Sequence, residues 1–168
     1  MLNNPLSDSY LDLLEQHKGI IYKVTQAYTR ELRDREDLQQ EIAFQLWRAW
    51  PQYSPRFKVS TWVYRIALNV AISFVRKSAR RPKSLAAEDA KLLTLQSTDH
   101  QEAEEQHLWL HRFIDELNHL DKAVILLYLD DWPQQDIADT FGLSLTNVST
   151  KINRIKNQLK QKFKTLNE

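Results

Sequence analysis

The 168-residue sequence has no cysteine. This absence excludes structural disulfides and thiolate zinc sites, and it fits a reducing compartment. The opening residues, MLNNPLSDSY, lack the basic segment followed by an apolar one that marks a secretory signal peptide. The longest strongly apolar run, residues 124–129, is far shorter than the roughly 20 residues that span a bilayer. These absences predict a soluble, cytoplasmic protein without membrane insertion.

Turn-forming residues are also scarce, with two glycines and five prolines in the whole chain. A β-sandwich or an α/β fold needs many more, so the composition predicts an all-α fold class. Apolar residues recur at three- and four-residue steps, as on one face of a helix. Asp34, Ser60 and Asp121 lie where such runs begin and are expected to cap the helices. Trp47 and Trp50 are expected to extend the apolar face of the helix that opens at Asp34, before Pro51 ends it.

A polar stretch of mixed pattern, residues 82–101, separates two helical regions. It predicts a flexible linker with room for one short helix around residues 86–95. The expected organisation is therefore a small helical domain at residues 1–81, this linker, and a second small helical domain at residues 102–168.

The net charge is only +1, but the charges are unevenly distributed. Residues 144–168 contain a single acid, Glu168, and six basic residues: Lys151, Arg154, Lys156, Lys160, Lys162 and Lys164. A second basic cluster consists of Arg76, Lys77, Arg80, Arg81 and Lys83. Solvated helix surface explains either cluster alone, but two separated clusters suggest a polyanion contacted at two places.

Residues 133–160 have the pattern of a helix-turn-helix. This motif needs a small residue where its helices cross, a residue that tolerates positive φ in the turn, and a branched apolar residue that anchors the second helix. Ala138, Gly142 and Val148 meet these needs in that order, and Ser144 is placed to cap the second helix. The apolar residues of that helix form one stripe: Val148, Ile152, Ile155 and Leu159.

The face opposite that stripe carries short hydrogen-bonding and cationic side chains, the types that read base edges and hold phosphates. The predicted DNA-binding residues are Ser149, Thr150, Lys151, Asn153, Arg154 and Asn157. A helical hairpin with a merely hydrated polar face gives a similar pattern. The absence of any acid between residues 143 and 166 favours DNA binding.

Blocks in both halves of the chain resemble the bacterial extracytoplasmic-function (ECF) sigma factors of the sigma-70 family. Residues 34–50, DREDLQQEIAFQLWRAW, and residues 60–72, STWVYRIALNVAI, resemble their conserved domain 2. Residues 120–129, LDKAVILLYL, and the IA, GLS and VSTKINR elements of residues 137–154 resemble their domain 4. The segment DWP at residues 131–133 replaces a turn that usually contains glycine. The resemblance implies two helical domains that direct core RNA polymerase to specific promoters and initiate transcription.

The resemblance also implies two polymerase contacts. In that family, the helix that matches residues 37–50 docks on the clamp helices of the largest polymerase subunit. The implied contact residues are Asp37, Gln40, Glu41, Gln45 and Arg48. Domain 4 is expected to bind the promoter −35 element and the flap of the second-largest subunit. Family members are commonly held inactive by an anti-sigma protein, so such a partner is a further expectation.

Family members melt the promoter −10 element by capturing an unstacked base of the non-template strand. Capture of single-stranded DNA requires aromatic platforms and cations. The residues that match this work are Tyr53, Arg56, Phe57, Lys58, Trp62, Arg65, Asn69, Arg76 and Lys77. Trp62 lies one turn before Ile66 and is also a candidate for the core, which makes the loop residue Phe57 the stronger platform candidate.

Other classes of function remain as alternatives. His107 and His111 lie one helical turn apart with Glu104 nearby, but no glutamate of a zinc protease motif and no remote ligand accompanies them. No metal, no cofactor and no enzymatic activity is therefore expected. A stand-alone helix-turn-helix regulator would bind a palindromic duplex without polymerase. A protein-interaction module would lack the salt-dependent DNA affinity that phosphate contacts produce.

Overall fold

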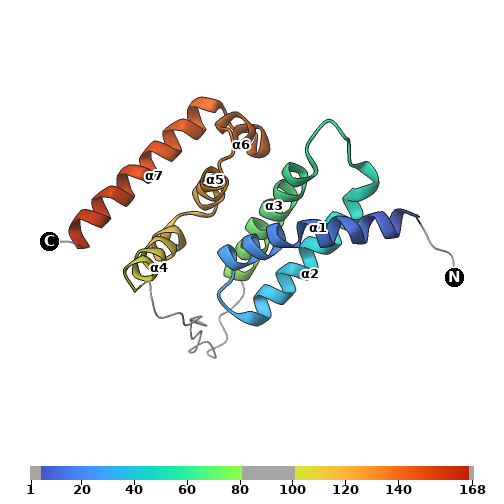
Figure 1. The fold of residues 1–168 in the computed structure, drawn as a ribbon, viewed down its shortest axis with the longest axis horizontal. Coiled ribbons are helices and arrows are strands. Elements are labelled where there is room, and N and C mark those ends of the chain that lie inside the picture. Colours follow the sequence, from blue (N-terminus) through green and yellow to red (C-terminus); the bar gives the residue numbers. More distant parts are fainter. Residues whose placement is uncertain (1–4, 81–100, 167–168) are drawn as a thin grey trace. The chain divides into compact units, whose positions relative to one another are not determined.

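The computed structural model describes residues 5–80 and 101–166, and every helix or strand element within these ranges is a helix (Figure 1). The elements are α1 (Pro5–Tyr28), α2 (Leu32–Ala49), the 3-10 turn η1 (Trp50–Gln52), α3 (Val59–Ala79), α4 (Gln101–Glu116), α5 (His119–Leu129), α6 (Gln134–Phe141) and α7 (Leu145–Leu166). The all-α prediction is confirmed. Residues 82–100 of the predicted linker lie outside the described residues, and so does the short helix expected around residues 86–95. None of the helices in the described ranges combines the length and the apolar character that a membrane crossing needs.

The chain divides into two compact units, residues 1–91 and 92–168. In the first unit, α1, α2 and α3 pack against one another (Figure 1). Their largest fully buried side chains are Val24, Leu38, Ile42, Leu46, Val63 and Leu68. Burial of each such side chain contributes about 1.5–3 kcal/mol. The buried residues of α2 recur every four positions, so one face of α2 is fixed in the core and the opposite face is left to solvent.

The second unit has its own core. Helices α5, α6 and α7 pack on one another through fully buried Val124, Leu127, Ile137 and Ile152. Helix α4 joins them through a cluster formed by Phe113, Ile114, Ile125 and Ile155. The stripe predicted along the second helix of the motif is therefore the stripe that anchors α7 to the rest of the unit.

Three capping predictions are wrong because the helices begin earlier than expected. Helix α2 begins two residues before Asp34 and α3 one residue before Ser60, and neither N-terminus has a side-chain cap bond. Both side chains therefore lie inside the first turn. The cap of α5 is Asn118, whose side-chain oxygen accepts a hydrogen bond from the Asp121 backbone N–H at 2.9 Å. The carboxylate of Asp121 is thereby left for tertiary contacts.

Candidate nucleic-acid interface

The turn between α6 and α7 has the geometry that a helix-turn-helix requires. Gly142 ends α6 in the left-handed region, with φ 65° and ψ 33°, as predicted. The Leu143 N–H then donates to the Ala138 carbonyl at 2.9 Å, and the small Ala138 side chain is fully buried. The Asn147 N–H donates to the Ser144 hydroxyl at 3.1 Å, which confirms Ser144 as the side-chain cap of α7.

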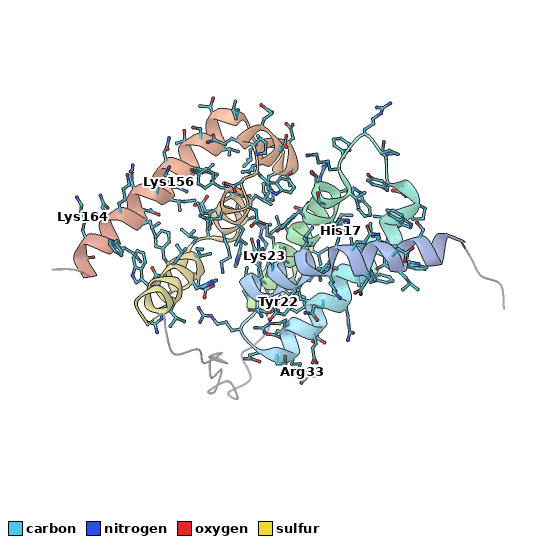
Figure 2. The ribbon with its side chains drawn as sticks, viewed as in Figure 1. His17, Tyr22, Lys23, Arg33, Lys156 and Lys164 are labelled. Atoms are coloured by element: carbon cyan, nitrogen blue, oxygen red, sulfur yellow. The ribbon has the colours of Figure 1, made fainter. Side chains whose placement is uncertain are left out.

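The predicted DNA-binding residues of α7 fall on its solvent side. Thr150, Asn153, Arg154 and Asn157 are exposed, whereas Ser149 and Lys151 on the flanks are half-buried. The face continues towards the C-terminus with further lysines, of which Lys156 and Lys164 are labelled on α7 in Figure 2. No acid occurs on α7. The face combines hydrogen-bonding groups near its start with positive charge further along.

The first turn of α7 adds residues that the sequence analysis missed. Leu145 is 47% exposed, and Thr146 and Asn147 are also exposed. The N-terminal residues of a recognition helix are those that contact base edges in the major groove. The cap at Ser144 fixes where α7 begins, so these positions are predictable by counting from the cap.

Asp121 organises the flank of α7. Its residue is 3% exposed, and its Oδ1 accepts a hydrogen bond from the Lys151 ammonium at 2.9 Å. Its Oδ2 accepts hydrogen bonds from the Arg154 guanidinium and from the Asn118 side-chain amide, the latter at 2.7 Å. Burial raises the pKa of the Asp121 carboxyl, but the hydrogen bonds from Lys151 and Asn118 and the charges of Lys151 and Arg154 outweigh burial and hold the pKa below its usual range.

The first unit has an aromatic cluster beside the loop that precedes α3. Trp50 stacks on Tyr53 with ring centroids 5.4 Å apart, and Trp62 lies 5.9 Å and 5.3 Å from those two rings. All three side chains are half-buried. The Tyr53 hydroxyl donates to the Phe57 carbonyl at 2.7 Å. The structure therefore joins Tyr53 to Trp62 and leaves the Phe57 ring, 56% exposed, at the loop.

The remaining residues predicted for strand opening are exposed side chains on this loop and on α3: Arg56, Lys58, Arg65, Asn69, Arg76 and Lys77. The α3 members are four, seven and one residues apart, and at about 100° per residue they lie opposite the buried face that includes Val63 and Leu68. No acid occurs between residues 42 and 87. The aromatic cluster and the outer face of α3 are therefore part of a continuous acid-free segment.

The outer face of α2 differs in chemistry. Its predicted partner-binding residues Asp37, Gln40, Glu41 and Arg48 are exposed, and Gln45 is half-buried with its amide donating to Glu41 at 2.8 Å. Two aromatic residues lie among them: Phe44 is 50% exposed and Trp47 is 56% exposed. The expectation that Trp47 extends the apolar inner face is wrong, because that face is complete with residues four positions apart and Trp47 lies outside it.

Phe44 and Trp47 form a small exposed aromatic patch. Their ring centroids are 6.4 Å apart, and the Arg48 guanidinium lies 5.9 Å from the Phe44 ring centre. Exposed aromatic residues next to arginine are typical of protein–protein interfaces. Sequence reasoning assigned Trp47 to the buried face and did not single out Phe44, because the spacing of the two residues also fits a wide buried face.

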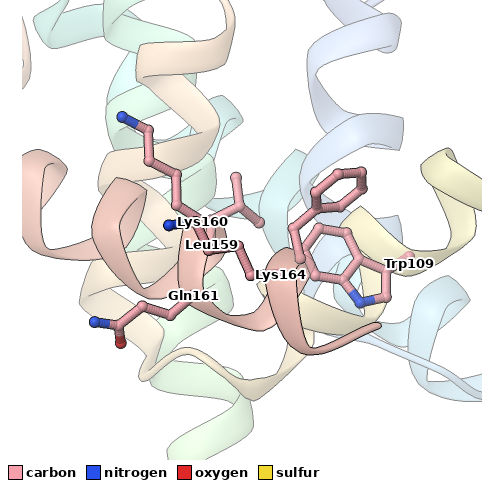
Figure 3. A pocket seen from close by; sticks show the side chains of 6 residues that line it. Trp109, Leu159, Lys160, Gln161 and Lys164 are labelled. Carbon is pink, nitrogen blue, oxygen red and sulfur yellow. The ribbon is translucent and has the colours of Figure 1, made fainter. Parts of the chain in front are cut away.

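An apolar groove lies between α4 and the end of α7 (Figure 3). It has a volume of 380 Å³ and is lined by Trp109, Leu159, Lys160, Gln161, Phe163 and Lys164. The rings of Trp109 and Phe163 meet edge to face with centroids 5.5 Å apart. Two lysines border this apolar floor, which makes the groove suitable for an apolar segment with negative charge.

The histidine pair considered as a metal site gains no support. His111 is exposed, and the side chains of Glu104 and His107 lie outside the described residues. Among the described side chains, no group of three or more histidine, aspartate or glutamate residues is placed to hold a metal ion.

Two family descriptions match this chain. Residues 13–81 match "Sigma-70 region 2" and residues 107–159 match "Sigma-70, region 4". RNA polymerase sigma factor SigV of Bacillus subtilis is 25% identical over 142 residues, which cover 84% of this chain and 82% of that protein. ECF RNA polymerase sigma factor SigE of Mycolicibacterium smegmatis is 25% identical over 156 residues, which cover 90% of this chain but 60% of the relative.

The fold resembles a solved sigma factor. The sigma factor RpoE of Bartonella quintana, in complex with the anti-sigma factor NepR, superposes with a TM-score of 0.65 at 17% identity. The match covers 91% of this chain and 97% of that one. At this level of identity, the likeness concerns the fold.

Proposed function

The chain belongs to the sigma-70 family, among its extracytoplasmic-function members, and is an RNA polymerase sigma factor; from this we propose that its two units make separate and complementary promoter contacts. The observation that carries the proposal is the contrast between two exposed faces. The outer face of α2 mixes acids with exposed aromatic residues, whereas α7 carries basic and amide side chains and no acid. The working units are residues 1–81 and 102–168, joined by the linker at 82–101.

Helix α7 reads the −35 element from the major groove. Thr146, Asn147 and Thr150 lie at its N-terminal end, where a recognition helix reaches base edges. Asn153 and Asn157 extend this hydrogen-bonding face, and Ser149 lies at its edge. The half-exposed Arg154 reaches a base edge beside these groups, Lys151 lies at the edge of the face, and the lysines further along contact phosphates.

The loop before α3 and the outer face of α3 open the −10 element. The exposed Phe57 ring is the platform on which an extruded base stacks. Tyr53 and Trp62 support that loop from the half-buried aromatic cluster. Asn69 hydrogen-bonds a base edge, and the cations that hold the strand are Arg56, Lys58, Arg65, Arg76 and Lys77.

Two surfaces bind core RNA polymerase. The outer face of α2 docks on the clamp helices of the largest subunit through Asp37, Gln40, Glu41, Gln45 and Arg48, with Phe44 and Trp47 as its apolar anchors. The groove at Trp109 and Phe163 receives the flap of the second-largest subunit. The solved RpoE is bound to an anti-sigma factor, NepR, and by analogy an anti-sigma protein competes for these surfaces of this chain.

The polymerase, and not this chain, supplies the chemistry of RNA synthesis. The chain acts as a binding factor without catalytic residues of its own, and it works in the cytoplasm, where bacterial RNA polymerase and promoter DNA are found. Neither the polymerase contacts nor the promoter contacts require a metal or a cofactor.

Substitution of one exposed aromatic residue tests the polymerase contact. In Trp47→Ala, the lost side chain is 56% exposed, so the fold is retained while an interface anchor is removed. We expect affinity for purified core polymerase to fall by about 30-fold, the effect of a hot-spot residue of about 2 kcal/mol. The matched control is Tyr22→Ala on α1, which removes an aromatic residue of the same 56% exposure. Equal core affinity of the two variants would contradict the assignment of α2.

A further inference from the structure

Among the residues that the structure describes, two acidic residues outside α7 pair with its cations, and their surroundings differ. Glu116 pairs with Lys162 near the end of α7, where both side chains are well exposed, 61% and 48%. Asp121 pairs with Lys151 and Arg154 in the first half of α7, and its own side chain is only 4% exposed. A surface pair such as the first contributes little, whereas a buried carboxylate with two cations is a fixed part of the structure.

Both carboxylate oxygens of Asp121 are used by this arrangement. Oδ1 accepts from Lys151, and Oδ2 accepts from Arg154 and Asn118. The Lys151 side chain is withdrawn from solvent, at 19% exposure, while Arg154 remains 52% exposed. The three charged groups together present one net positive charge at the edge of the α7 face instead of two.

This location matters because the two cations are neighbours of the residues that face DNA. Lys151 follows Thr150 directly, and Arg154 follows Asn153. Affinity for DNA of any sequence comes from phosphate neutralisation, whereas sequence is read by hydrogen bonds at base edges. A carboxylate that pairs with two cations therefore weakens the phosphate contacts that give affinity for DNA of any sequence. It leaves the hydrogen bonds to base edges, which read the sequence, in place.

We propose that Asp121 is an internal counter-anion that withholds Lys151 and Arg154 from phosphate contacts and thereby limits the affinity of α7 for non-specific duplex DNA. The inference rests on the proposed role of α7 at the −35 element. Asp121 is a positioning residue that acts through the two cations. Its consequence is a larger ratio of promoter affinity to random-DNA affinity, the quantity that matters among many competing genomic sites.

An ion pair that only fastens α5 to α7 predicts the opposite effect. Loss of such a pair loosens α7 and weakens binding to every DNA. Loss of an internal counter-anion strengthens binding to random DNA and steepens its salt dependence. The sign of the change therefore separates the two roles.

The test uses the full chain carrying Asp121→Asn, which keeps the shape of the side chain and removes its charge. Fluorescence anisotropy with a random-sequence duplex gives the binding constant over a series of salt concentrations. We expect the slope of log affinity against log salt to steepen by about 0.9 for each released cation, up to about 1.8. The same relation gives a gain in affinity of at least about five-fold at 0.15 M salt.

The matched control is Asp115→Asn. Asp115 pairs with buried Lys122 at 3.0 Å, so this variant changes the net charge equally and also breaks an ion pair with a buried lysine in the same unit. Neither Asp115 nor Lys122 lies on α7. For Asp115→Asn, we therefore expect the slope of log affinity against log salt to equal that of the wild type. A gain in the Asp121→Asn variant no larger than in this control, or a loss of affinity in a variant that retains its helical circular dichroism, overturns the proposal.

A second variant decides the question if Asp121→Asn does not fold. Asp121→Asn combined with Lys151→Met removes the half-buried ammonium together with its partner, so only Arg154 is released. We expect the slope to steepen by about 0.9, and an unchanged slope overturns the proposal. Promoter-directed transcription by the wild type with core polymerase is run in parallel. Its failure would reject the proposed function, whereas equal duplex binding by wild type and variants rejects only the role of Asp121.

Discussion

The same substitution at the two glycines of the chain has opposite expected effects. A Cβ added at Gly19 or at Gly142 would meet no atom within 4 Å, so steric contact distinguishes neither site. Of the two glycines, Gly142 alone has a left-handed backbone, with φ 65°. A left-handed conformation costs an L-residue about 1–2 kcal/mol, whereas alanine in a helix interior is favoured over glycine by about 0.5–1 kcal/mol. Gly142→Ala should therefore destabilise its unit and Gly19→Ala should stabilise the other.

Amide hydrogen exchange in the full chain resolves the two units in one experiment. A loss of about 1 kcal/mol in Gly142→Ala speeds exchange through global opening of α6 and α7 by about five-fold. In Gly19→Ala, exchange in α1 slows by about two- to five-fold. Each unit is the internal control of the other, because the substitution in one leaves the core of the other unchanged. Slower exchange of α7 in Gly142→Ala would refute the left-handed turn on which the helix-turn-helix geometry depends.

Three further predictions concern single side chains. Arg154→Ala should weaken binding to the −35 element by about 1–3 kcal/mol and leave the affinity for core polymerase unchanged. Promoter-directed transcription measures the first effect and co-elution with core polymerase the second. Equal transcription by mutant and wild type would contradict the assignment of Arg154 to the −35 element. Tyr53→Phe keeps the ring stacking and removes the hydroxyl bond to the Phe57 carbonyl, so permanganate reactivity of opened thymines should fall while core affinity is retained. Because the folded-state pKa of Asp121 is lowered, its ionised form stabilises the second unit above the unfolded pKa of about 4, and this stability is lost as pH falls through the folded pKa. Thermal unfolding of Asp121→Asn should therefore show a weaker acid dependence than wild type below about pH 4.

The features that the sequence predicted best are those set by local chemistry. Gly142 and Ser144 determine the turn and the cap within a few residues of themselves, and both behave as expected. The near absence of glycine likewise suffices for the all-α fold class. The stripe of α7 was predictable because helical spacing alone decides which side chains share a face.

The features that sequence reasoning missed depend on tertiary packing. Asp121 has the residue type of a cap, but Asn118 takes that position, and the partners of the carboxylate lie 30 and 33 residues away on α7. Spacing along α5 contains no information about that distance. Trp47 was misplaced for a related reason, because apolar character does not reveal how wide the buried face of α2 is.

Transcription in vitro with purified core RNA polymerase is the most direct test of promoter recognition by the two units. The template is the genomic DNA of the source bacterium, and the 5′ ends of the transcripts are mapped with and without the full chain. We predict new start sites that appear only when the protein is present and that share a two-part upstream motif. The Arg154→Ala variant should no longer recognise the distal part of this motif. No new start sites, together with tight binding of the protein alone to a palindromic duplex, would contradict this function and identify a stand-alone regulator.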